Sequence, residues 1–442
     1  MRDLFNHPSH PYTAGLLSCV PKPPGEGEAT TKLRRIAGDV YSAGEQTKEA
    51  CLFAPRCPMV QDSCRSEAPE MAEAGVNHQS RCFFRDEVRP DIWGEPEPRS
   101  TSRKNGAEQI LDARELRRLY GSERRKYLLF GPRVSPPVRA LNDVAFRVDK
   151  GRTLGIVGES GSGKTTGARS VVGLLAPSRG EIRLRDSTLA GLVEQRTSEE
   201  RAALRMVFQN PTASLNPKLP IRHTIMRSLR RFAGLDRRES RVRAAELLQA
   251  VGLHPSYLDR PPGELSGGEQ QRAALAGAFA ANPDVIVADE AVSSLDVSVQ
   301  AQVLNVLEER QQELGNSYIF ITHDLGVVRY ISDDILVLYA GHVAEYGPAE
   351  SVLDLPSHPY TEALLSAAPV PDPDAAPTLI RLPGAVPTMR EAFKECFFAG
   401  RYPRKIGPIC DETPPPARAG PDSPEHVIYC HIPVDELAAM QR

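Results

Sequence analysis

A glycine-rich loop between an apolar segment and a helix-forming segment constrains this sequence more than any other feature. Residues 153–157 (Thr-Leu-Gly-Ile-Val) predict a buried strand, which runs directly into the sequence Gly-Glu-Ser-Gly-Ser-Gly-Lys-Thr at 158–165. Glycines let backbone N–H groups crowd around a phosphate, and the N-terminus of the following helix favours the anion. The loop therefore predicts an α/β fold that binds a nucleotide phosphate through Lys164 and Mg²⁺ through Thr165.

A second apolar segment ends in two acids. Residues 285–288 (Val-Ile-Val-Ala) predict a buried strand, and Asp289 and Glu290 follow it. We expect this strand to place its last carboxylates beside the phosphate loop, with Asp289 associated with Mg²⁺ and Glu290 acting as a base or orienting water. The alternative interpretation is a strand that ends in a solvated acidic turn.

The segment 265–272, Leu-Ser-Gly-Gly-Glu-Gln-Gln-Arg, narrows the class. It closely resembles the signature of ABC ATPases. Ser266 suits the N-cap of the next helix, and Gly267 and Gly268 expose that helix's N-terminal amides, so the cap and a phosphate contact can be one feature. The resemblance implies a P-loop NTPase fold, α/β, with a RecA-like core, a helical subdomain, an antiparallel β subdomain and a C-terminal peptide-importer extension.

The same resemblance implies the remaining nucleotide-site residues. Gln209 corresponds to the Q-loop glutamine that senses Mg²⁺ and water, His323 to the switch histidine at the γ-phosphate, and Asp296 to the aspartate of the D-loop after the acidic strand. Tyr120 is our choice for the aromatic ring that stacks on adenine, with Tyr127 and Phe130 as rivals and core packing as the other interpretation. The expected nucleotide-binding set is Gly158, Glu159, Ser160, Gly161, Ser162, Gly163, Lys164, Thr165, Thr166, Tyr120, Ser266, Gly267, Gly268 and Asp296.

Landmarks near the N-terminus recur near the C-terminus. Ser-His-Pro-Tyr-Thr occurs at 9–13 and at 357–361, a cysteine segment at 51–58 matches 396–403, and His-x3-Cys at 78–82 matches 426–430. Matched landmarks in one order predict a tail module present twice. We expect residues 1–84 to be the tail of a truncated first ATPase, 85–106 a linker, 107–355 an ABC ATPase domain and 356–442 its C-terminal extension.

The tail also indicates the subfamily. His358-Pro-Tyr-Thr361 and the segment 208–217 are typical of the peptide and nickel importer ATPases. That resemblance implies an ATPase that powers uptake of short peptides from the cytoplasmic face of the membrane. It further implies a head-to-tail dimer with a second ABC ATPase domain, two transmembrane permease subunits and, indirectly, an extracytoplasmic binding protein. The helix-forming insertion around 237–251 would dock the permease.

Four cysteines cluster in the first tail copy: Cys51, Cys57, Cys64 and Cys82. Four thiolates suit a [4Fe–4S] cluster or a structural Zn²⁺, and the spacing alone does not decide between them. The family resemblance favours the cluster, and four buried reduced thiols are the third interpretation. In the second copy Tyr402 replaces one cysteine, so we expect that site to be weak or empty unless His426 or His431 supplies a ligand.

The amino-acid composition excludes few classes of protein function, but it argues against a nucleic-acid partner. The formal net charge is −3 at pH 7, without the basic excess typical of nucleic-acid binders. Two other hypotheses are a soluble ABC ATPase of translation or DNA repair and a non-catalytic partner ATPase. Glu290 argues against the non-catalytic one, since a degenerate site often loses this acid.

Overall fold

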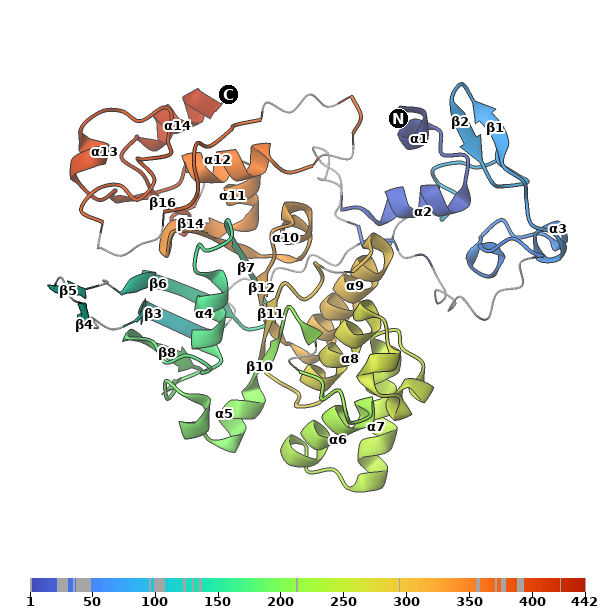
Figure 1. Ribbon diagram of the computed structural model, residues 1–442, viewed down its shortest axis with the longest axis horizontal. Helices are drawn as coiled ribbons and strands as arrows, with labels where there is room; N and C mark the ends of the chain where they lie inside the picture. Colours follow the sequence, from blue (N-terminus) through green and yellow to red (C-terminus); the bar gives the residue numbers. More distant parts are fainter. Residues whose placement is uncertain are drawn as a thin grey trace. The chain divides into compact units, whose positions relative to one another are not determined.

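The computed structural model describes most of the chain, and the described ranges are 2–21, 31–34, 36, 49–94, 97–98, 108–121, 125–128, 131–134, 137–211, 214–293, 295–354, 358–369, 372–374, 379–387, 393–421 and 423–441 (Figure 1). For residues 125–128, 131–134 and 354 only the backbone is described. The chain forms two compact units. The first comprises Met1–Arg103, Leu295–Leu307 and Pro369–Pro377, and the second Lys104–Ser294, Glu308–Ala368 and Thr378–Arg442.

The first unit is built from short elements. They are α1 (Arg2–Asn6), α2 (Pro11–Cys19), η1 (Ala54–Arg56), α3 (Asp62–Ser66), β1 (Ala72–Gly75) and β2 (His78–Ser80). Trp93 packs here: its indole Nε1 donates to the carbonyl oxygen of Pro11 at 3.0 Å, and a Cβ at Gly15 would lie 3.0 Å from its ring. Trp93, which lies in the expected linker 85–106, therefore attaches the start of that segment to α2.

The second unit contains an eight-stranded sheet in the order β10-β11-β12-β7-β13-β14-β16-β15. The first five strands pair in parallel, and they are β10 (Leu204–Val207), β11 (Val285–Asp289), β12 (Ser317–Ile321), β7 (Thr153–Val157) and β13 (Asp334–Tyr339). Every residue of β7, β11 and β12 is buried. Such continuously buried, largely apolar strands are typical of a parallel sheet covered on both faces.

A second, antiparallel sheet has the order β6-β3-β8-β9. Its strands are β3 (Gln109–Tyr120), β6 (Val138–Asp149), β8 (Arg179–Leu184) and β9 (Ser187–Thr188), and a separate hairpin pairs β4 (Arg125–Leu128) with β5 (Gly131–Val134). Leu116 and Phe146 of this sheet share one buried cluster with Leu154 and Ile156 of β7. This apolar contact joins the two sheets into one core.

Helices complete the second unit (Figure 1). They are α4 (Lys164–Val171), η2 (Val193–Gln195), α5 (Ser198–Ala203), α6 (Ile221–Phe232), α7 (Arg237–Ala250), η4 (Pro255–Asp259), η5 (Pro262–Glu264), α8 (Gly267–Phe279), α9 (Val297–Leu314), α10 (Leu325–Ile331) and α11 (Ala349–Asp354), with α9 contributing residues to both units. Helices α6, α7 and α8 pack on one another. Parallel core, antiparallel sheet and helical part together confirm the expected fold class.

The C-terminal part extends the core sheet. Strand β14 (His342–Pro348) pairs with β16 (Val427–Tyr429), which pairs with β15 (Ala417–Ala419), and helices α12 (Pro359–Ser366), α13 (Ile409–Glu412) and α14 (Val434–Gln441) surround them. We call the residues from His358 onward the C-terminal extension. It is hydrogen-bonded into the same sheet as the phosphate loop's strand.

The two copies of the repeated landmarks have the same local hydrogen bonds. The imidazole Nδ1 atoms of His10 and His358 each accept from the backbone N–H two residues later, at 3.0 Å, so each histidine caps its helix. The N–H of Cys51 donates to the carbonyl of Cys64 at 2.9 Å, and Cys396 donates to Cys410 at the same distance. The sequence repeat is therefore also a repeat of backbone geometry.

A buried polar cluster explains the motif at 358–361. The Glu345 carboxylate is fully buried; it accepts from the Thr361 hydroxyl and from the His358 N–H, and His426 Nε2 lies 2.6 Å from it. Burial raises the pKa of Glu345. Burial likewise lowers the pKa of His358 to about 3. The cluster joins β14, α12 and the segment before β16.

We predict that His358→Asn reduces the acid sensitivity of the second unit. Between pH 6.5 and about 3 the unfolded chain binds a proton at His358 that the folded chain does not, so the free energy of unfolding falls as pH falls. From pH 7 to pH 5 this amounts to about 2 kcal/mol, and asparagine, which still caps α12, removes it. Urea unfolding followed by circular dichroism at both pH values measures the difference. Equal pH dependence in the variant and the parent would contradict the assignment.

Candidate nucleotide-binding site

The phosphate loop lies between β7 and α4. Gly158 has φ +145°, and a Cβ there would collide with the carbonyl oxygen of Leu338. Gly163 has φ +108° and forms the N-cap of α4, where a Cβ would lie 2.6 Å from the carbonyl oxygen of Ala140. These positions tolerate only glycine, because the loop folds tightly against neighbouring backbone. The remaining loop residues Ser160, Gly161 and Ser162 lie between them, and the buried Ser162 hydroxyl has no hydrogen-bond partner within the described ranges.

Lys164 lies inside this loop. Its ammonium donates to the carbonyl oxygens of Gly158 at 2.6 Å and Glu159 at 2.8 Å. Burial lowers the pKa of Lys164, while the carboxylates of Glu290, Asp289 and Glu159 act in the opposite direction. A desolvated cation at the N-terminus of a helix is suited to binding a phosphate.

Thr165 and Asp289 meet across the sheet edge. The Thr165 hydroxyl, on the first turn of α4, donates to Asp289 Oδ1, at the end of β11, at 3.1 Å. Asp289 is 3% exposed, and burial raises the pKa of its carboxyl group. A hydroxyl and a carboxylate at this spacing are the oxygen ligands that Mg²⁺ takes in nucleotide sites. The residues present therefore fit a magnesium ion bound with the phosphates.

Glu290 stands between two polar side chains. Gln209, after β10, donates from Nε2 to Glu290 Oε2 at 2.6 Å, and His323 Nδ1, after β12, lies 3.7 Å from Glu290 Oε1. Glu290 has φ +49°, an uncommon backbone conformation for a residue with a side chain, and its N–H donates to the carbonyl of Ile321 at 2.9 Å. The kinked backbone turns this carboxylate out of the sheet and toward Gln209 and His323.

Tyr120 lies at the end of β3 beside the same helix. Its hydroxyl is 3.5 Å from Thr166 Oγ1, and the residue is 38% exposed, with the Arg118 guanidinium 5.2 Å from its ring centre. An exposed ring next to the phosphate loop leaves a face available for a base. The rivals are not comparable, because the side chain of Tyr127 and all of Phe130 lie outside the described residues.

The predicted signature residues 266–268 and Asp296 lie outside the phosphate loop. Ser266 caps α8: its hydroxyl accepts from the Glu269 N–H at 3.3 Å, and its own N–H donates to Glu269 Oε2 at 2.7 Å. In the described part of the chain no hydrogen bond connects Ser266, Gly267 or Gly268 to the phosphate loop. Asp296 caps α9 by accepting from the N–H groups of Ser298 and Val299. It belongs to the first unit, and Ser294, two residues before it, lies outside the described residues.

Two residues that sequence reasoning did not assign to the site contact the phosphate loop. The Glu159 N–H donates to the Tyr360 hydroxyl at 2.7 Å, and Arg401 binds the Glu159 carboxylate through two nitrogens. Both belong to the C-terminal extension. The available signal was the repeat, since Tyr12 and Arg56 stand at the matching positions of the first copy.

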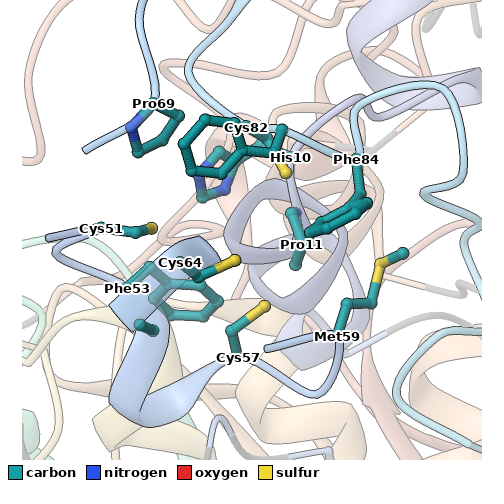
Figure 2. Close-up of a pocket in the computed structure, with 12 residues that line it drawn as sticks. His10, Pro11, Cys51, Phe53, Cys57, Met59, Cys64, Pro69, Cys82 and Phe84 are labelled. Carbon is teal, nitrogen blue, oxygen red and sulfur yellow. The ribbon is translucent and has the colours of Figure 1, made fainter. Parts of the chain in front are cut away.

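The four cysteines of the first copy line one pocket. Cys51, Cys57, Cys64 and Cys82 share it with His10, Phe53 and Phe84, and Figure 2 shows their sulfur atoms turned toward a common space. Burial, together with the neighbouring thiols, raises the pKa of Cys57 to about 11. Within the described ranges, no three His, Cys, Asp or Glu side chains are grouped to hold a metal ion.

The matching pocket of the second copy is lined by Cys396, Cys410, Cys430 and Tyr402. The phenol ring occupies the place of the fourth thiol. Of the two histidines considered as substitute ligands, His431 lines the pocket, with its Nε2 3.0 Å from the Thr413 carbonyl oxygen, and His426 is bound to Glu345 instead.

Phosphate loop, hydroxyl–carboxylate pair and the Gln209–Glu290–His323 group together define a nucleotide-hydrolysing ATP-binding cassette. Comparisons with known proteins give the family. The ABC transporter family model matches residues 141–293, and the model described as oligopeptide/dipeptide transporter, C-terminal region, matches residues 1–64 and 344–410. The second model therefore matches both copies of the repeat.

Curated relatives agree. A probable peptide ABC transporter ATP-binding protein of Sinorhizobium fredii is 43% identical and covers 69% of this chain and 85% of its own length. The oligopeptide transport ATP-binding protein AppF of Bacillus subtilis is 40% identical and covers 74% and 98%. The oligopeptide transport ATP-binding protein OppD of Mycobacterium bovis is 37% identical over 84% of this chain, and the chain spans 60% of that relative's length. A solved dimeric cassette bound to ADP and Pi is 26% identical, covering 54% of this chain and 99% of its own, with a TM-score of 0.48.

The chain belongs to the ATP-binding proteins of ABC transporters, in the oligopeptide/dipeptide group. Its membership confirms ATP and Mg²⁺ as ligands and ATP hydrolysis as the activity class. None of the helices in the described ranges combines the length and apolarity that a membrane span requires.

We predict that Ser266→Ala and Thr197→Ala destabilise the second unit equally but differ in activity. Thr197 caps α5 with the same reciprocal arrangement that Ser266 forms at α8, so each loss costs about 1 kcal/mol. Only the Ser266 variant should also lower the ATPase rate of the assembled transporter, because the family resemblance implies that only that helix end receives a phosphate. Thermal unfolding and phosphate release measure the two effects. Equal ATPase rates in both variants would assign Ser266 to capping alone.

Proposed function

We propose that this protein is the ATP-hydrolysing subunit of an ABC importer that powers uptake of short peptides. The observation that supports it most directly is Glu290, held between Gln209 and His323 at the edge where Thr165 and Asp289 meet. The peptide cargo rests on the relatives, whose names describe oligopeptide or peptide transport, and on the two matches to the oligopeptide/dipeptide C-terminal region.

The geometry and the family resemblance support the following residue roles. Lys164 turns from the carbonyls of Gly158 and Glu159 to the β- and γ-phosphates, and the loop N–H groups bind the same oxygens. Thr165 and Asp289 would hold Mg²⁺, whose charge would offset the negative charge that develops on the phosphates. Glu290 accepts a proton from, or orients, the attacking water, and Gln209 and His323 fix its carboxylate. Catalysis here is positioning and charge stabilisation.

Assembly completes the site. The chain supplies one phosphate loop and one signature segment, so ATP at this loop needs a signature from a second ABC ATPase domain. Ser266, Gly267, Gly268 and Asp296 would serve the partner's nucleotide, and Tyr120 the adenine of this one. Two transmembrane permease subunits dock at helices α6 and α7, which places the protein at the cytoplasmic face of the membrane as a peripheral subunit, with an extracytoplasmic binding protein delivering the cargo.

The first cysteine pocket is proposed to hold a [4Fe–4S] cluster. Cys51, Cys57, Cys64 and Cys82 would be its ligands. Four cysteine sulfurs turned toward one pocket suit either group, and it is the family resemblance that favours the cluster over zinc.

We predict that Glu290→Gln binds Mg-ATP but turns it over at least about 100-fold more slowly, since amide cannot accept the proton and loses its charge. Stopped-flow phosphate release and retention of labelled ATP measure the two properties. Arg179→Gln, which breaks an exposed ion pair with Glu115 in the antiparallel sheet, is the control and should keep the parental rate. Unchanged hydrolysis in the Glu290 variant would refute its role.

Anaerobically purified protein should contain iron and acid-labile sulfide and absorb in the visible range. Cys57→Ser should remove most of both, whereas Cys19→Ser, a buried cysteine outside the pocket, and Cys410→Ser, in the second pocket, should not. Iron and sulfide analysis with circular dichroism as a folding control makes the comparison. A colourless, iron-free and folded parent protein would rule the cluster out.

A further inference from the structure

We propose that Arg401 and Tyr360 of the C-terminal extension are positioning residues for ATP binding, which hold Glu159 so that its carboxylate is neutralised and kept from competing with the triphosphate for Lys164. The inference rests on the proposed use of this loop for ATP. It assigns the extension a role inside the nucleotide site.

The contacts come from two separate parts of the extension. Arg401 Nη1 lies 2.5 Å from Glu159 Oε2, and Nη2 lies 3.2 Å from Oε1, a two-point pair. Tyr360, on the first turn of α12, accepts the Glu159 N–H at 2.7 Å. The side chain and the backbone of one loop residue are thus each fixed by the extension.

Both anchors are buried and make further contacts within the second unit. Arg401 is 8% exposed, and its Nε and Nη2 also donate to the carbonyl oxygens of Pro383 at 2.9 Å and Gly384 at 3.4 Å. Tyr360 is fully buried, and its ring centre lies 4.7 Å from that of Tyr339, over which the guanidinium of Arg401 also lies, at 5.8 Å. The bond to Glu159 holds the pKa of Arg401 above its usual value, so its charge is permanent.

The carboxylate of Glu159 has to be neutralised because this residue lies within the phosphate loop. Its carbonyl oxygen accepts from Lys164 Nζ, and its carboxylate contributes to the negative field at that ammonium. An uncompensated carboxylate in a phosphate loop repels the triphosphate and retains the lysine. A bidentate guanidinium removes that charge and fixes its direction. Burying such a pair is costly, so its value lies in specifying this geometry more than in stability.

The internal repeat supplies an independent observation. The first copy differs from the second at a pocket position, Cys57 against Tyr402, yet it has Tyr12 and Arg56 at the positions of Tyr360 and Arg401. Both copies therefore keep the two residue types that the proposal requires, even where the pocket next to them has changed.

The test compares affinities for mant-ATP, a fluorescent ATP analogue, in the full-length protein with Mg²⁺. Arg401→Ala should weaken binding about tenfold, because it leaves the Glu159 charge beside the phosphates. The double variant Glu159→Gln, Arg401→Ala removes both charges and should return to within about threefold of the parent. Arg404→Ala, which breaks the pair with Glu362 elsewhere in the extension, is the matched control and should bind as the parent does.

Two results would overturn the proposal: parental affinity in Arg401→Ala, or a double variant as weak as the single one. A merely structural role predicts the latter, because a loosened extension is not repaired by a second substitution. A different result is expected if the proposed function itself is wrong. In that case the parent itself does not bind mant-ATP, or Lys164→Ala binds it equally well.

Discussion

The in-register parallel pairing of β7, β12 and β11 is the constraint on which the nucleotide site depends. Ile156 of β7 pairs with Ile321 of β12, and Ile321 pairs with Asp289 of β11. The three strands therefore end side by side, and the residues that follow each of them emerge at one edge. A shift of one residue in either pairing would turn the acids into the core and separate Thr165 from its carboxylate. Because the strands are buried on both faces, such a shift is strongly disfavoured.

The sequence predicted the parts of this site whose chemistry is local. Lys164 and Thr165 follow their glycines directly, and Asp289 and Glu290 end an apolar strand, so short-range pattern was enough. Contacts between residues that lie far apart in the sequence could not be predicted from it. Arg401 lies 242 positions from Glu159, and no periodicity links them. Spacing likewise did not choose between His426 and His431, because the choice depends on the carboxylate of Glu345, a buried partner on another strand.

The repeat shows that the same local backbone path can enclose two pockets with different side chains. Each copy keeps its histidine cap and its cysteine-to-cysteine backbone bond, and these fix the local path of the chain. The pocket that this path encloses is then free to differ. Four thiols face the first pocket, and a tyrosine ring fills part of the second. Aromatic packing around Phe398 and Tyr402, 5.7 Å between ring centres, compensates for the absent thiol by filling its volume.

The attachment of β16 to β14 has a consequence for the integrity of the molecule. Strand β14 is the outer strand of the cassette proper, and the extension supplies its neighbour through Ile428 and Val427. A chain shortened ahead of α12 would leave β14 with open N–H and C=O groups and would remove Thr361 and His426, the hydrogen-bond partners of the Glu345 carboxylate. Such an edge recruits strands from other molecules. The shortened cassette would thus self-associate into aggregates rather than persist as a smaller soluble enzyme, which makes the extension a protective cover as well as a part of the sheet.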